Sequence, residues 1–110
     1  MDERCYQVST TAGSFEEAER LASTVLEARL AACVQIVGPV QSRYWWNGSL
    51  ERAEEWILLL KTRADRFRPL SRALREAHSY EVPEITAVPI AEGTDDYLRW
   101  VEEESEPSEA

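Results

Sequence analysis

Lysine and histidine are almost missing from this chain of 110 residues. Lys61 is the only lysine and His78 the only histidine, whereas acidic residues number 21. The formal net charge of −9 argues against a sequence-independent nucleic-acid binder, because such proteins need a basic surface that displaces counterions from phosphates. With one histidine there is no zinc motif of the HExxH kind, and no Ser-His-Asp pattern stands out.

Cysteine is also scarce, and long apolar runs are absent. Cys5 and Cys33 are too few and too far apart for a disulfide framework or a zinc site. No segment approaches the roughly 20 apolar residues of a membrane-spanning helix. The first residues lack a basic patch followed by an apolar run. We therefore expect a cytoplasmic protein with no membrane or nucleic-acid partner. GxGxxG and P-loop motifs are absent too, so the usual nucleotide sites are not expected.

The length and composition predict one globular domain. A chain of this size forms about one domain, and its hydrophobic fraction of 44% and charged fraction of 30% are typical of soluble proteins. We predict a single domain over residues 1–104. The acidic residues 105–110 are predicted to form a disordered tail, because they offer little apolar surface to bury.

Hydrophobic periodicity predicts two strands and a helix outside the middle of the chain. Residues 5–11 and 84–92 have the β-branched and aromatic content of strands. Residues 15–30 repeat apolar side chains at helical spacing. Ser14 and Glu17 stand at the start of that repeat with the spacing of a capping box, in which each side chain bonds a backbone N–H of the other residue.

Two further helices are predicted. The first begins near 66–68, because Pro69 is tolerated only in the first turn of a helix, and it ends near His78. The last is short and follows Thr94, which is placed to cap it, with acidic residues in its first turn.

The middle of the chain predicts one long β-hairpin. Asn47-Gly48 is a strong turn signal, because both positions of a type I′ turn need positive φ. The arms run over 32–46 and 49–62, and Gly38-Pro39 should interrupt the first arm as a bulge or bend. A two-residue loop pairs Tyr44, Trp45 and Trp46 with Glu51, Leu50 and Ser49.

Such long arms predict an oligomer. They exceed what a small domain can cover, so an apolar edge and the aromatic tip at 44–46 would face water, and surfaces of this kind mediate association.

The full order is β-α-β-β-α-β with a C-terminal helix. This is the α+β, ferredoxin-like split βαβ arrangement, with one antiparallel sheet and two helices on one face.

Five motifs occur in a fixed order along residues 6–104. They are RLAACV at 29–34, YWWNG at 44–48, the pattern formed by Glu55, Lys61 and Thr62, HSYEVPEI at 78–85, and YLRWV at 97–101. Together they resemble the CutA family of divalent-cation tolerance proteins. The resemblance implies a homotrimer whose long hairpins wrap onto neighbouring subunits, no enzymatic activity, and a role in tolerance of copper and other divalent cations.

Two residues are candidate metal ligands. His78 and Glu84 offer imidazole and carboxylate donors, which suit copper(II) and related ions. The alternatives are that His78 bonds the last carbonyls of its helix and that Glu84 pairs with arginines. Copper-binding members of the family can carry a cysteine and a second histidine where this chain has Thr10 and Ala77. Ser79 also replaces the proline that usually follows the histidine.

Three more residues are candidates for binding a ligand in a crevice between subunits. They are Lys61, Tyr80 and Glu81. Lys61 ends an apolar run, so it is either a stem that reaches solvent or a cation that is held by Glu81 or Glu84 or offered to an anion. Tyr80 has the alternative of packing in a subunit interface. Cys33 is expected to be a buried thiol.

Two functions follow from these observations. The first is a homotrimeric divalent-cation tolerance protein that binds copper(II) or related ions weakly in a subunit crevice. The alternative is a PII-like trimeric signalling or scaffold module, similar in architecture to nitrogen-regulatory proteins, that binds a small molecule or a protein partner without metal. An enzyme is not expected, because nothing in the sequence marks a substrate.

Overall fold

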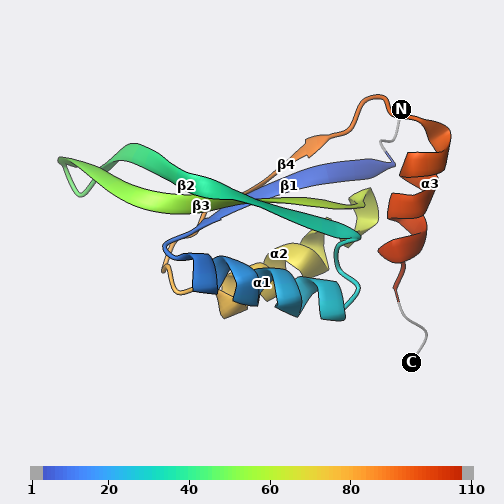
Figure 1. Cartoon of the computed structure of the whole chain (residues 1–110), viewed down its shortest axis with the longest axis horizontal. Helices are drawn as coiled ribbons and strands as arrows, with labels where there is room; N and C mark the ends of the chain where they lie inside the picture. The colour runs from blue at the N-terminus through green and yellow to red at the C-terminus, as the bar shows by residue number, and fades with distance from the viewer. Residues whose placement is uncertain (1–3, 108–110) are drawn as a thin grey trace.

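The computed structural model describes residues 4–107 and has the predicted order of elements (Figure 1). The elements are β1 (Cys5–Ala12), α1 (Phe15–Glu27), β2 (Cys33–Trp46), β3 (Ser49–Arg63), the 3₁₀ turn η1 (Ala64–Arg66), α2 (Phe67–Ala77), β4 (Ile85–Pro89) and α3 (Asp95–Glu104). No helix within 4–107 is long and apolar enough to cross a membrane.

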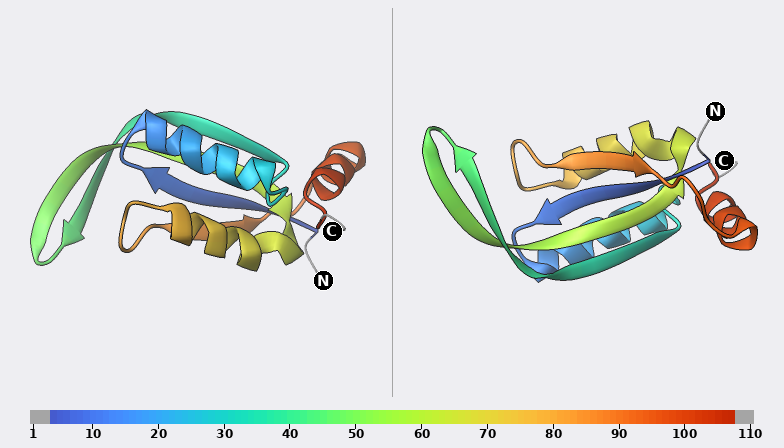
Figure 2. Two further views of the ribbon diagram at one scale, coloured as in Figure 1. Left: turned by 90° about the horizontal axis from the view of Figure 1, so that it is seen from below. Right: turned by 90° about the horizontal axis from the view of Figure 1, so that it is seen from above.

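One antiparallel sheet carries the fold, in the strand order β2-β3-β1-β4. This order, with a helix between β1 and β2 and another between β3 and β4, is the predicted split βαβ arrangement. Helices α1 and α2 lie side by side on one face of the sheet, and α3 lies beyond the end at which β1 begins (Figures 1 and 2). The α+β prediction is therefore confirmed.

The core lies between the sheet and the two helices. Alternate strand residues point to one face, so Val8, Leu58 and Leu60 are fully buried against the apolar stripes of α1 and α2. Leu21 of α1 and Leu70 and Leu74 of α2 are fully buried in this core. The same alternation turns Ile57 and Leu59 to the opposite face, which α1 and α2 leave uncovered.

The long hairpin has the predicted register. Trp45 pairs with Leu50 across the turn, and Asn47 and Gly48 have φ values of 50° and 79°, as a type I′ turn requires. The register shifts between Val37 and Val40, which confirms the irregularity predicted at Gly38-Pro39. A Cβ atom at Gly38 would lie 2.6 Å from a ring carbon of Trp56, so this position needs glycine. The hairpin extends past the other strands (Figure 2).

Two predicted boundaries are wrong by a few residues. Helix α1 ends at Glu27 rather than 30, because Arg29 adopts φ 59° and the amide of Leu30 bonds the carbonyl of Val25. This is a left-handed turn that ends a helix. Strand β4 covers Ile85–Pro89 rather than 84–92, since proline cannot donate to the ladder.

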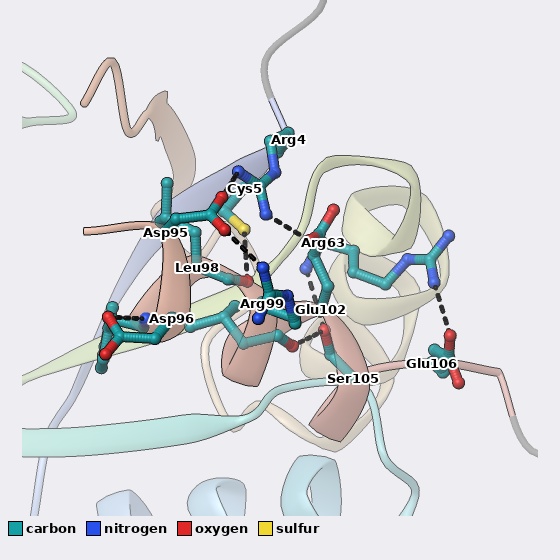
Figure 3. Close-up of polar contacts among 12 residues, drawn as sticks. Arg4, Cys5, Arg63, Asp95, Asp96, Leu98, Arg99, Glu102, Ser105 and Glu106 are labelled. Carbon is teal, nitrogen blue, oxygen red and sulfur yellow. Dashed lines mark hydrogen bonds and ion pairs between the residues drawn. The ribbon is translucent and has the colours of Figure 1, made fainter. Parts of the chain in front are cut away.

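Helix α3 is attached to the sheet by apolar and polar contacts (Figure 3). Leu98 and Val101 are buried with Cys5. The Arg4 guanidinium contacts Asp95 at 3.1 Å and Glu102 at 2.7 Å, although exposed ion pairs of this kind contribute little stability. Thr94 stands at the N-cap position as predicted, but its side chain makes no capping bond.

The first residue of the predicted tail is part of this attachment. Ser105 is fully buried. Its hydroxyl donates to the carbonyl of Val101 at 2.6 Å and accepts from the amide of Arg63 at 3.1 Å. Folded structure thus continues to at least Ser105, past the boundary predicted at 104. Residues 108–110 of that tail lie outside the described residues, so their predicted disorder stays a prediction.

Candidate functional site

A cleft of about 550 Å³ lies between the hairpin and the segment that follows α2. This volume is in the range of small-molecule sites. Its lining combines three aromatic rings, three carboxylates, two hydroxyls, one guanidinium and one aliphatic side chain: Tyr44, Trp46, Tyr80, Glu55, Glu81, Glu84, Thr11, Ser42, Arg43 and Val82. The structure thereby brings together the predicted residues Tyr80, Glu81 and Glu84.

Glu55 is the buried acid of this cleft. It stands on β3 with 7% of its surface exposed, and the Tyr80 hydroxyl donates to its Oε2 at 2.7 Å. Burial first, and then this hydrogen bond, raise the pKa of Tyr80. The phenol therefore stays protonated at neutral pH and holds the carboxylate in place as a donor.

His78 lies next to Tyr80, and its side chain is fully enclosed. Its Nε2 is 2.6 Å from the carbonyl oxygen of Thr11 and donates to it, while its Nδ1 accepts from the amide of Tyr80 at 3.1 Å. These partners fit the tautomer that carries a proton on Nε2. Both nitrogens are therefore occupied, and the ring positions Tyr80 rather than lining the cleft.

Glu17 supports the same segment, which the sequence analysis did not foresee. Its Oε2 accepts from the amide of Ser79 at 2.8 Å. Burial alone would raise the pKa of Glu17, but the hydrogen bonds from Ser79 and Gly13 outweigh it and lower the pKa. The predicted capping box is half present: the amide of Glu17 bonds the Ser14 hydroxyl, while its carboxylate reaches Gly13 and Ser79 instead of Ser14.

Lys61 lies away from the other crevice candidates. It pairs with Gln7 and Cys33 in the sheet register, and its ammonium donates to the side-chain carbonyl of Gln35. Six residues separate it from Glu55 along β3, which corresponds to roughly 20 Å. Within the chain, the structure does not bring Lys61 to Tyr80 or Glu81.

The donor set for a metal is incomplete within one chain. The Glu84 carboxylate accepts from the Thr86 hydroxyl at 3.2 Å and is exposed, and Glu81 is exposed as well. Across residues 4–107 no three His, Cys, Asp or Glu side chains are grouped so that they could hold an ion. A strong copper(II) site needs several nitrogen, oxygen or sulfur donors, so further ligands would have to come from another copy.

Comparison with known proteins identifies the family. The model of the CutA1 divalent ion tolerance protein family matches residues 6–104. The chain belongs to this family. The resemblance seen in the five motifs is thereby confirmed, and CutA1 proteins are tolerance proteins that are generally not enzymes.

Relatives and solved structures of CutA proteins are similar over nearly the whole chain. The divalent-cation tolerance protein CutA of Archaeoglobus fulgidus is 44% identical over 93 residues, or 84% of this chain and 90% of its own. That of Thermus thermophilus is 44% identical over 96 residues, or 87% and 93%. The solved structure of the Archaeoglobus protein matches with a TM-score of 0.90 at 41% identity, covering 93% of this chain and 99% of its own.

CutA relatives come from different compartments. The Archaeoglobus structure is described as a periplasmic protein. A CutA protein of Arabidopsis thaliana, 38% identical over 86% of this chain and 52% of its own length, is described as chloroplastic. The predicted cytoplasmic location of this CutA1 family member therefore stays a prediction.

Thr10 carries an unsatisfied hydroxyl in the core. It is fully buried on β1, and its Oγ1 is the one fully buried side-chain polar atom without a hydrogen-bond partner within the described part of the chain. Ala77 is the second position at which copper-binding family members can carry a ligand. It ends α2 and has no donor atom in its side chain, and its carbonyl accepts a hydrogen bond from Arg20 at 2.8 Å.

We expect Thr10→Val to raise the free energy of unfolding by about 1 kcal/mol, because it removes a buried polar group that has no partner. Urea denaturation measures the change. Thr62→Val is the matched control, since Thr62 is equally buried but donates to the Leu30 carbonyl at 2.8 Å. That control is expected to lose about 1 kcal/mol. A loss of stability in Thr10→Val would contradict the assignment.

Proposed function

We propose that this CutA1 family member acts in divalent-cation tolerance as a homotrimer that binds copper(II) or a related ion weakly in the cleft. The observation that carries the proposal is the gathering of Glu55, Glu81 and Glu84 around one cleft, in a chain of net charge −9. Carboxylates attract divalent cations, and a concave acidic site concentrates them.

Exposed apolar surface supports the trimer. Trp45 and Leu50 at the hairpin tip are 73% and 63% exposed. Ile57 and Leu59 are half-buried and by strand alternation point to the sheet face opposite α1 and α2. Large exposed apolar side chains often mark association sites, and further copies of the chain would cover them. The cleft beside the hairpin then lies at a subunit boundary.

Glu81 and Glu84 are the ligands that we assign to the metal, because both are exposed at the cleft. A neighbouring subunit completes the coordination. His78, the other metal candidate, would have to give up its bond to the Thr11 carbonyl or to the Tyr80 amide before it could bind an ion. The same engagement leaves it unsuited to proton transfer, so the proposal includes no enzymatic reaction.

Calorimetric titration of tag-free protein with copper(II) tests the metal. We expect saturable binding with a dissociation constant in about the micromolar range or weaker, and about one ion per subunit. The variant Glu81→Gln/Glu84→Gln should bind about tenfold more weakly. Glu76→Gln/Glu103→Gln is the matched control, because it removes the same charge from exposed helix positions.

Two outcomes would refute the metal assignment. One is the absence of saturable binding to the wild-type protein. The other is an equal loss in both double variants, which would indicate that the net charge rather than the cleft attracts the ion.

The PII-like function without metal is the second candidate. The aromatic lining of the cleft by Tyr44, Trp46 and Tyr80 favours it, because small-molecule sites are mostly apolar with a few placed polar groups. A thermal-shift screen of metabolites would show a stabilising compound if this function holds, together with no copper binding.

A further inference from the structure

We infer that the inner end of the cleft, around Glu55, binds the ammonium group of a small organic cation. The inference uses the cleft described above as a ligand site, but it requires neither the metal nor the trimer. It rests on the burial of Glu55, on the atoms around it and on the rings that line the cleft.

The first argument is that Glu55 has no positive partner. It is nine-tenths buried, yet none of the ion pairs found among residues 4–107 includes it. A buried carboxylate is unfavourable unless a cation compensates it. The Tyr80 hydroxyl supplies one hydrogen bond but no charge. Among the described residues of one chain, the Glu55 carboxylate therefore lacks a compensating positive charge.

The second argument concerns the free oxygen of Glu55. Oε2 is occupied by Tyr80, whereas Oε1 accepts no hydrogen bond from the described residues. Oε1 is not fully enclosed either, so it is accessible from the cleft. The hydroxyls of Thr11 and Ser42 line the same space. An ammonium group has three donors, and Oε1 with the oxygen atoms of Thr11 and Ser42 offers acceptors along the same cleft.

The third argument is the aromatic lining. Tyr44, Trp46 and Tyr80 line the same cleft as Glu55, and the faces of such rings attract organic cations. A bare divalent ion gains more from several convergent donor atoms, and the described residues do not group three of them. Arg43 is the lining cation, and its side chain is exposed. The three lining carboxylates therefore outweigh it, and the cleft retains a negative charge.

Titration of the full chain with butylammonium chloride, followed by NMR, tests the inference. Butanol and sodium butyrate serve as neutral and anionic probes of similar size at constant ionic strength. We expect saturable binding of butylammonium in about the millimolar range, as suits so small a ligand, and no saturation by the other two probes.

The variant Glu55→Gln is expected to weaken butylammonium binding about tenfold or more, because it removes a charge-assisted hydrogen bond while the amide oxygen can still accept from Tyr80. Glu54→Gln is the matched control: it removes the same charge from the neighbouring exposed position and should bind like the wild type. Trp46→Leu, at the exposed hairpin tip, is a second variant in case Glu55→Gln does not fold, and it should bind several-fold more weakly.

Three results would overturn the inference. The first is the absence of saturable butylammonium binding to the wild type, and the second is equal binding of butanol. The third is an unchanged affinity in Glu55→Gln, or in Trp46→Leu if Glu55→Gln does not fold. The copper titration separates this failure from that of the proposed function. Copper binding without butylammonium binding rejects the organic cation and keeps the metal. Butylammonium binding without copper binding keeps the organic cation and rejects the metal.

Discussion

A light-scattering mass of about three times the 12.6 kDa chain is expected for the wild-type protein, and the mass of one chain for the variant Trp45→Glu/Leu50→Glu. The two residues face each other across the hairpin register and are largely exposed. In a trimer they would be covered by a neighbour. Two carboxylates placed there would be desolvated without partners, which is strongly unfavourable.

The control for this result is Ser23→Glu/Thr24→Glu. It adds the same charge to exposed positions of α1, on the helix side of the sheet, and is expected to remain a trimer. Neither Trp45 nor Leu50 lines the cleft, so the monomeric variant would also show whether butylammonium binding needs a second subunit. A wild-type mass of one chain would reject the trimer, and a trimeric hairpin variant would reject the tip as its interface.

The second large effect is expected from His78→Ala, which should lower the free energy of unfolding by about 2–4 kcal/mol. The substitution leaves a cavity where the enclosed ring stood. It also leaves the Thr11 carbonyl and the Tyr80 amide without their partners. Urea denaturation at neutral pH measures the loss.

The matched control is Glu76→Ala, an exposed position near the end of α2, which should change stability by less than about 0.5 kcal/mol. If His78 were mainly a metal ligand on the surface, the metal-free His78→Ala protein would be as stable as this control. Such a result would return His78 to the metal site.

The sequence predicted most of the fold because the local signals agreed with one another. Asn47-Gly48 defined the hairpin register, and the apolar repeat over residues 15–30 defined the first helix. Boundaries were less accurate where tertiary contacts decided them. The left-handed turn at Arg29 shortened α1, and the contacts of Ser105 with Arg63 and Val101 extended the folded part. Neither residue carries a sequence signal for these roles.

The candidate site was predictable only in part. Tyr80, Glu81 and Glu84 belong to one motif and were found together. Thr11, Ser42 and Arg43 have no distinctive pattern, and they line the cleft because the hairpin bends over the end of β1. Lys61 attracted notice as the only lysine, but the strand carries it about 20 Å from Glu55. That a residue type is rare in the sequence does not show where the residue lies in the fold.

By itself, the sequence determined the element order, the turn at Asn47-Gly48, the apolar face of each helix and the family, because these depend on residue types at short spacings. Tertiary structure alone decided that His78 is enclosed and bonded through both nitrogens, and that Glu55 is buried beside Tyr80 with no ion-pair partner within residues 4–107. Burial and hydrogen-bond partners depend on residues far apart in the chain. A residue's chemical type therefore does not reveal whether it is free to bind.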